Sequence, residues 1–187
     1  MVAIKLQITY FEMNTKLLYI LIGGALLLMP KVNFAQAPIL GTAAGFALFS
    51  TNGSVSNSGI SQVTGNIGTN NGSSTAFGNV NGTMHDQDAA SAQCSADLLI
   101  AYNQLNNMIP TFFPSSSLGN GDTLVAGVYA IGAPATLNAT LYLNAKGNSN
   151  AVFVLQIGGA FSTNAGARIA LVNGAQACMC FGKLKDW

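Results

Sequence analysis

Charged side chains are scarce in this 187-residue chain, and their scarcity excludes several classes of function. Charged residues make up 7% of the sequence, whereas an ordinary globular domain has roughly 25%. Seven Lys and Arg against six Asp and Glu give a formal net charge of +1, and no basic run is available to neutralise nucleic-acid phosphates. With 50% hydrophobic residues, the chain also differs from a charged disordered protein. One His and six carboxylates leave few candidates for acid–base catalysis.

The chain also lacks an apolar run long enough to cross a membrane. Its longest uncharged apolar segment, residues 17–29, lies between Lys16 and Pro30-Lys31. As a helix, that segment would span about 20 Å, which is shorter than the roughly 30 Å hydrocarbon core of a bilayer. A basic residue followed by a short apolar core is typical of a secretory signal peptide. We therefore predict a signal over residues 1–35 and a secreted protein, extracellular or periplasmic. Met13 is a possible true start, and a membrane anchor is the alternative.

Residues 86–109 differ in pattern from the rest of the chain. Residues 38–84 contain isolated apolar residues separated by turn-forming Asn-Gly pairs, which predicts short strands. In residues 86–109, glycine is rare and apolar residues recur every three or four positions, which predicts an amphipathic helix. Asp86 or Asp88 would cap its start, and Pro110 would end it. The predicted buried stripe consists of Ala90, Cys94, Leu98, Tyr102, Leu105 and Ile109.

Residues 122–178 return to short strands. Their predicted starts fall about fifteen residues apart, near positions 123, 136, 151 and 167, with small polar turns and no helix between them. This arrangement favours a β-solenoid, in which each coil buries its inward residues against the coils above and below. A β-sandwich is the alternative that the same strand spacing permits.

Alternation along the strands separates an apolar face from a small polar one. Leu137, Leu141 and Leu143 fall on one face, and Thr and Asn residues fall on the other, because successive strand residues point to opposite sides. The outward residues are short and uncharged, so they can order water without the hydration shell of a charge. Ordinary solvent-facing positions are the plainer interpretation. Our candidate contact residues, chosen by alternation alone, are Thr64, Asn66, Thr136, Asn138 and Thr140.

Signals for catalysis are weak. His85 lies next to Asp86 and close to Asp88, a group that would suit a metal site or a catalytic dyad. A lone His at the start of a helix more often serves as a capping or packing residue, which is the interpretation we favour. Nucleophile-elbow, Walker-type and HExxH motifs do not occur in the sequence. We therefore predict no enzyme activity, no catalytic residue, no cofactor and no metal.

Several segments, in order along residues 38–178, match the motifs of one known family; they include residues 40–44, 63–68, 82–85, 127–129, 151–158 and 172–178. On these segments the chain resembles the bacterial and fungal ice-binding proteins. The resemblance implies an all-β-dominated fold: a discontinuous right-handed β-solenoid with one long α-helix packed alongside. It also implies a secreted protein that adsorbs to ice, inhibits recrystallisation and works as a monomer at full length. The family's Thr-Ala/Gly-x-Thr/Asn surface motif has no match here, so its ice-contact residues cannot be transferred.

The C-terminal end departs from this resemblance. After Cys178, family members continue with Asn-Val-Phe-Trp and further coils, whereas this chain ends MCFGKLKDW. One inserted base before the codon of Met179 would restore NVFW. We therefore predict that residues 36–178 form the ice-binding-like domain and that residues 179–187 are an out-of-frame tail. A chain truncated in this way would expose apolar edges within residues 38–70 and would be poorly soluble or inactive.

Two classes of function fit the sequence. The leading one is adsorption to ice through a flat, uncharged face of Thr, Asn, Ser and Ala. The alternative is an extracellular adhesin or polysaccharide-binding module that uses the same solenoid. In either case, nucleic acid is not an expected partner, and no membrane span would remain once the signal is removed.

Overall fold

The computed structural model describes residues 35–184, so the predicted signal, apart from Ala35, and the last three residues lie outside the described part of the chain. The described residues belong to one compact unit. None of the helices within residues 35–184 is long and apolar enough to cross a membrane.

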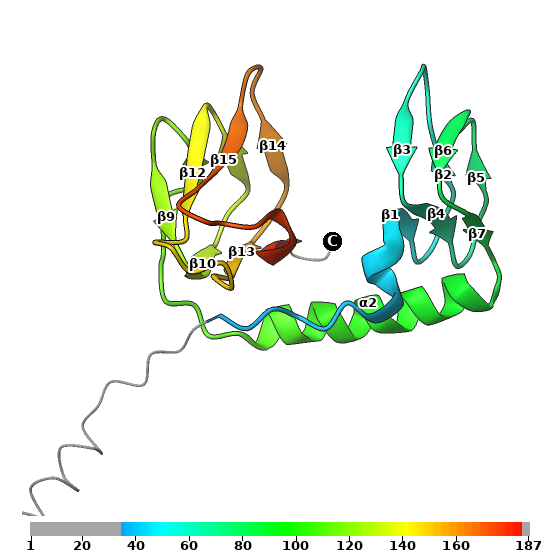
Figure 1. The fold of residues 1–187 in the computed structure, drawn as a ribbon, viewed down its shortest axis with the longest axis horizontal. Coiled ribbons are helices and arrows are strands. Elements are labelled where there is room, and N and C mark those ends of the chain that lie inside the picture. The colour runs from blue at the N-terminus through cyan, green and yellow to red at the C-terminus, as the bar shows by residue number, and fades with distance from the viewer. Residues whose placement is uncertain (1–34, 185–187) are drawn as a thin grey trace, which may run out of the picture. The chain divides into compact units, whose positions relative to one another are not determined.

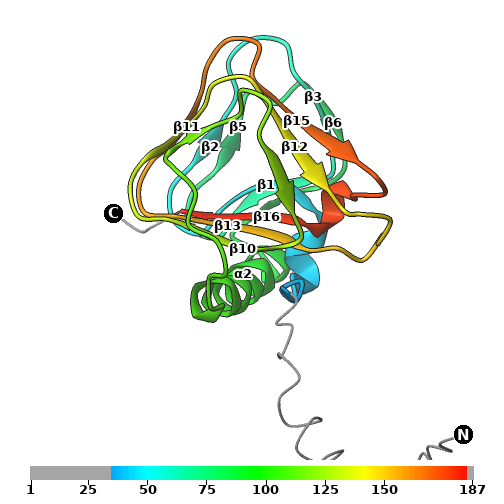
Figure 2. The same cartoon turned by 90° about the vertical axis from the view of Figure 1, so that its left-hand side faces the viewer.

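Parallel pairing organises the C-terminal strands into a stack of three coils. Its sheets have the strand orders β8-β11-β14, β9-β12-β15 and β10-β13-β16, and they enclose a triangular cross-section (Figure 2). Because every described strand pair is parallel, the β-solenoid prediction is confirmed and the β-sandwich is excluded. The strands are β8 (Ser117–Leu118), β9 (Thr123–Val125), β10 (Gly127–Ile131), β11 (Ala135–Leu137), β12 (Thr140–Asn144), β13 (Phe153–Ile157), β14 (Phe161–Thr163), β15 (Arg168–Val172) and β16 (Cys180–Leu184).

A smaller N-terminal stack follows the same plan, with sheets β1-β4-β7, β2-β5 and β3-β6. A short 3-10 helix, η1, precedes it, and a second one, η2 (Ala177–Met179), precedes β16. The N-terminal elements are η1 (Gly41–Gly45), β1 (Phe46–Ser50), β2 (Val55–Ser56), β3 (Gln62–Thr64), β4 (Asn66–Thr69), β5 (Ser74–Thr75), β6 (Asn79–Asn81) and β7 (Met84–Asp86).

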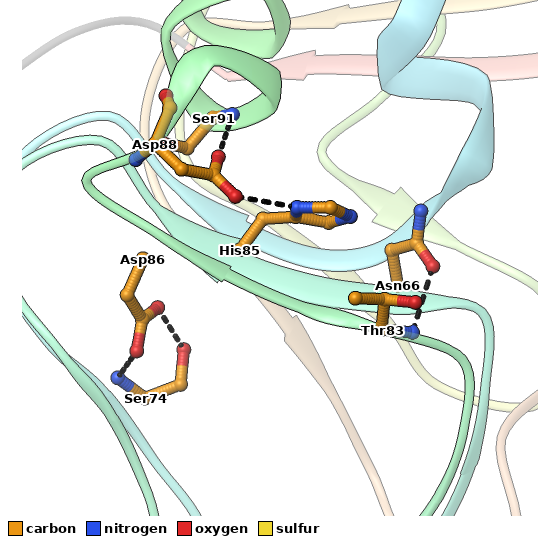
Figure 3. A network of polar contacts seen from close by, with 7 residues as sticks. All are labelled: Asn66, Ser74, Thr83, His85, Asp86, Asp88 and Ser91. Atoms are coloured by element: carbon orange, nitrogen blue, oxygen red, sulfur yellow. Dashed lines mark hydrogen bonds and ion pairs between the residues drawn. The ribbon is translucent and has the colours of Figure 1, made fainter.

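The long helix α2 (Ala89–Asn107) links the two stacks and runs beside both (Figure 1). Asp88 is its N-cap: the Ser91 backbone N–H donates to the Asp88 carboxylate at 2.8 Å, and the Asp88 N–H donates to Ser91 Oγ at 2.9 Å (Figure 3). This reciprocal capping box satisfies two backbone donors that a helix start leaves free. The predicted helix is thus confirmed, with slightly tighter bounds.

The buried side of α2 matches the predicted stripe only in part. Cys94 and Leu105 are buried as predicted, Ala90, Leu98 and Tyr102 are half-buried, and the buried Ser91 and Ala101 lie outside the predicted stripe. Burial raises the pKa of the Cys94 thiol to about 11, so it is unreactive at neutral pH. The prediction for Ile109 is wrong, because its side chain is 75% exposed. The helix ends at Met108, whose ψ of 134° turns the chain away before Ile109.

Apolar side chains of the C-terminal coils form the main core. Leu137, Leu141 and Leu143 are each 2% exposed or less, as the alternation predicted. Phe153 on the central strand β13 is fully buried among them. A second cluster, built on Leu105, Val128, Val152 and Val154, joins α2 to the sheet β10-β13-β16.

Side-chain amides and a carboxylate attach α2 to its neighbours on both sides. On the N-terminal side, the Ile39 N–H donates to Gln104 Oε1 at 2.7 Å, and Thr42 donates to the Asp97 carboxylate through both its N–H and its hydroxyl, each at 2.7 Å. On the C-terminal side, the Gln156 amide donates to the carbonyls of Leu105 (2.6 Å) and Met108 (3.0 Å). These carbonyls belong to a helix end that would otherwise leave acceptors free.

Residues 180–184 form β16, which lies in register beside β13, with Cys180 opposite Phe153 and Leu184 opposite Ile157. Leu48 of β1 and Leu184 of β16 are 43% and 44% exposed, so both strands present apolar surface to solvent. Cys94, Cys178 and Cys180 are all free thiols. The out-of-frame origin of residues 179–187, and the poor solubility expected from truncation, stay predictions.

The hydrogen bonds to the Asp97 carboxylate predict that the fold becomes less stable at acid pH. Hydrogen bonds from the Thr42 hydroxyl and N–H, and then from Gln93, lower the pKa of the Asp97 carboxyl below its ordinary value. Such a carboxylate stabilises the fold above its unfolded-state pKa, and the stabilisation is lost as the pH falls through the lowered pKa. The Asp97→Asn variant should therefore melt a few degrees below the wild type at neutral pH. The difference should shrink as the pH falls below the unfolded-state pKa of about 3.9 and through the lowered pKa of the folded state.

Thermal melts followed by circular dichroism across this pH range would measure the effect. Asp122→Asn, which changes an exposed carboxylate before β9, is the matched control and should leave the melting temperature nearly unchanged at each pH. A gap between wild type and Asp97→Asn that stays constant with pH would contradict the role assigned to the carboxylate.

Candidate functional site

The five candidate contact residues do not lie on one face of the molecule. Thr136 lies on β11, Asn138 follows β11 in the turn to β12, and Thr140 opens β12. Thr64 ends β3 and Asn66 opens β4, both in the N-terminal stack. The structure therefore brings together only Thr136 and Asn138.

Thr136 belongs to a row of hydroxyl groups that crosses three neighbouring strands. By strand register it lies between Ser117 of β8 and Ser162 of β14, and its Oγ1 lies 3.0 Å from Ser162 Oγ. Beneath this row, Leu118 and Leu137 point into the core and are 1% and 2% exposed. The hydroxyl groups are therefore held on a rigid, packed sheet.

Asn138 belongs to a second row beside the first. The Asn164 amide donates to Asn138 Oδ1 at 2.8 Å, and the Asn138 amide donates to Ser117 Oγ at 2.7 Å. Neighbouring strands in a sheet lie about 4.8 Å apart, so the first row repeats at that interval over three coils, and the second row, Asn138 and Asn164, over two. We call this surface the small-polar face; it consists of Ser117, Thr136, Asn138, Ser162 and Asn164.

Thr140 lies on a different surface, the sheet β9-β12-β15. Its Oγ1 accepts a hydrogen bond from Arg168 Nε at 2.9 Å, and the next outward residue of β12 is the bulky Tyr142. A guanidinium and a phenol make this face charged and uneven, which distinguishes it from the small-polar face.

The two candidates in the N-terminal stack have different surroundings. Thr64 is exposed, opposite Asn81 of β6. Asn66 is half-buried, and its Oδ1 accepts a hydrogen bond from the Thr83 N–H at 3.0 Å (Figure 3). The Asn66 side chain therefore fixes the backbone just before β7.

Sequence reasoning missed Ser117, Ser162 and Asn164. A usable signal was present, because Thr136 and Ser162 are 26 residues apart, and Asn138 and Asn164 are separated by the same interval. That interval is one coil. The interval is longer than the predicted spacing of about fifteen residues between strand starts, because one coil contains three strands.

The His85 cluster has structural partners. His85 Nδ1 lies 2.7 Å from the Asp88 carboxylate, and Asp86 accepts hydrogen bonds from the Ser74 N–H and hydroxyl, both at 2.7 Å (Figure 3). The Ser91 N–H, and then His85, lower the pKa of Asp88 below its ordinary value. Within residues 35–184, no three His, Cys, Asp or Glu side chains gather as a metal site would require. The favoured interpretation of His85 as a helix-start residue fits this geometry.

A cavity of about 850 Å³ lies between η1, α2 and β16, and its walls include Leu40, Leu98 and Phe181. Lys183 borders it, with Nζ 4.8 Å from the centre of the Tyr102 ring and 3.0 Å from Asn106 Oδ1. Because Leu40, Leu98 and Phe181 contribute to its walls, the cavity is mainly apolar and differs in this from the small-polar face.

Comparisons with known proteins agree on one family. The sequence profile of the family described as ice-binding-like matches residues 49–184. An ice-binding protein of Nostoc sp. (strain HG1) is 37% identical over 143 residues, which is 75% of this chain and 53% of that protein. The chain thus spans about half the length of this curated relative.

Solved structures show the same similarity. An ice-binding protein from an Antarctic bacterium of the Flavobacteriaceae superposes with a TM-score of 0.79 at 54% identity, covering 80% of this chain and 36% of that one. One from the Antarctic ascomycete Antarctomyces psychrotrophicus superposes with a TM-score of 0.76 at 31% identity, covering 80% of this chain and 74% of that one.

Proposed function

The chain belongs to the ice-binding-like family, and from this membership we propose that it binds ice through the small-polar face. The observation that supports this assignment is the pair of rows on one side of the sheet β8-β11-β14. Ser117, Thr136 and Ser162 form the first row, and Asn138 and Asn164, which follow β11 and β14, form the second. A binding role of this kind is not enzymatic and requires no cofactor.

The chemistry of the face suits a surface made of water. Ice is uncharged and periodic, and each of its molecules donates and accepts hydrogen bonds. Hydroxyl and amide groups also donate and accept, and the coil repeat sets them at regular intervals. Lys side chains, by contrast, are strongly hydrated and would keep water in their own shells.

Export is part of the same proposal. The apolar segment 17–29 after Lys16 would direct secretion, and removal of residues 1–35 would leave a chain starting at Gln36. A secreted protein of this type would meet ice outside the cytoplasm and act there by inhibiting growth and recrystallisation.

Substituting Thr136 tests the assignment of the face. Thr136→Tyr places a bulky ring between Ser117 and Ser162 and should reduce ice-recrystallisation inhibition by about tenfold, the loss expected for one central contact. Thr140→Tyr is the matched control, because it makes the same substitution on the face that holds Arg168, and it should leave activity within about twofold of wild type.

Three results would contradict the proposal. If Thr140→Tyr reduced activity and Thr136→Tyr did not, the contact surface would be the sheet β9-β12-β15. If both variants matched an active wild type, neither face would be the contact surface. A folded wild type that bound a polysaccharide matrix but left recrystallisation unchanged would favour the adhesin alternative.

A further inference from the structure

An exposed apolar loop follows α2, over residues 109–114. Ile109 and Phe113 are each 75% exposed, and Phe112 is 39% exposed. Large apolar side chains exposed side by side mark an interaction surface more often than isolated ones do. The small-polar face does not include these residues, so the proposed ice contact leaves them unexplained.

The base of the loop is rigid. Thr111 and Phe112 both donate their N–H groups to the Val128 carbonyl, at 2.8 and 3.1 Å, and the Ala130 N–H donates to the Phe112 carbonyl at 2.9 Å. The Phe112 ring stacks on Tyr129 with 4.7 Å between centroids and 19° between planes. Tyr129 is itself 4% exposed. Ile109 and Phe113 therefore project from a rigid backbone, so the loop loses little conformational entropy when these side chains bind.

The loop carries no charge that would have to leave water. Pro110 and Pro114 have no N–H, and the N–H groups of Thr111 and Phe112 and the carbonyl of Phe112 are hydrogen-bonded to β10. No charged residue occurs between Asp97 and Asp122. The loop can therefore enter the hydrated interfacial region of a bilayer without removing a charge from water.

We propose that the 109–114 loop inserts into the interfacial region of a zwitterionic lipid bilayer and holds the protein at its surface. The loop has no basic residue, so its attraction to a bilayer is apolar and requires no anionic lipid. A second copy of the chain is a poorer occupant. Three side chains offer roughly 400 Å², about half of the ~800 Å² that each partner contributes to a stable protein interface.

Vesicle flotation tests this proposal on residues 36–187, which lie within the compact unit and lack the apolar segment 17–29 that would itself bind lipid. The wild type should float with phosphatidylcholine vesicles. The Ile109→Asn, Phe113→Ser double variant should lose about tenfold or more of its partitioning, since each lost side chain removes a substantial apolar transfer free energy. Ile60→Asn is the matched control: Ile60 is 98% exposed and lies in the N-terminal stack, and its loss should leave partitioning unchanged.

A fluorescent reporter provides an independent measurement. Trp187 is the only tryptophan in the chain, so Phe113→Trp in a Trp187→Phe background places a single reporter in the loop. Its emission should shift to shorter wavelength when phosphatidylcholine vesicles are added. Because Phe113 is 75% exposed, thermal melts of all loop variants should match the wild type.

Other outcomes would overturn the proposal. One is an emission maximum of the Phe113→Trp reporter that vesicles do not change. Another is vesicle binding that requires anionic lipid and persists in the double variant. A third is a concentration-dependent dimer in the absence of lipid that the double variant abolishes, which would assign the loop to a second copy. The ice-recrystallisation assay distinguishes this inference from the proposed function, because the double variant should retain that activity.

Discussion

Replacing Phe153 with alanine should lower the free energy of unfolding by about 3–5 kcal/mol. Phe153 is fully buried on β13, the strand that lies between β10 and β16. Loss of its ring removes apolar contacts and leaves a cavity that the surrounding coils fill only in part. A domain is typically held by about 5–15 kcal/mol, so this single substitution should remove a large fraction of the total stability.

Urea denaturation followed by circular dichroism would measure the loss. Phe113→Ala removes the same atoms from a site that is 75% exposed, and it should change the free energy of unfolding by no more than about 0.5 kcal/mol. Equal losses in the two variants would mean that Phe153 does not occupy the packed centre of the C-terminal stack.

Replacing Gly68 with alanine should destabilise the N-terminal stack by about 2–3 kcal/mol. A Cβ at Gly68 would overlap the carbonyl oxygen of His85 on the neighbouring strand β7 and would lie 3.1 Å from the Phe46 ring. The backbone oxygen cannot move aside without breaking the pairing of β4 with β7, which places Gly68 opposite His85.

Gly78→Ala is the matched control for this substitution. A Cβ at Gly78 would meet nothing within 4 Å, so the variant should be neutral or more stable by up to about 1 kcal/mol. Thermal melts would compare the two proteins. A Gly68→Ala protein as stable as wild type would show that β4 and β7 are not paired in this register.

Local patterns in the sequence predicted the elements that local interactions determine. Alternation identified Leu137, Leu141 and Leu143 as inward residues, and the apolar period with Asp88 identified α2. The prediction failed at Ile109, because the turn at Met108 comes before Pro110 and changes the direction of the chain. The spacing of apolar residues indicates which side of a helix is buried, but it does not show at which residue the helix ends.

Residues of the small-polar face were harder to predict because they depend on pairing between coils. Thr136 and Thr140 lie close together in sequence and both point outward, yet the turn at Asn138 places them on different sheets. Ser162 is 26 residues from Thr136 and lies beside it. The sequence of a single strand does not identify such neighbours, because the number of residues in a coil determines which residues of successive coils lie side by side.

The attachment of residues 39–42 to α2 has a consequence for the order of folding during synthesis. Ile39 and Thr42 find their partners 65 and 55 residues later, at Gln104 and Asp97, and the carbonyl of Leu105 finds its partner 51 residues later, at Gln156. Contacts so distant in sequence form slowly, because long loops must close first. Because synthesis proceeds from the N-terminus, residues 39–42 cannot form these hydrogen bonds until α2 has been synthesised. The C-terminal end of α2 likewise cannot form its bond to Gln156 until β13 has been synthesised.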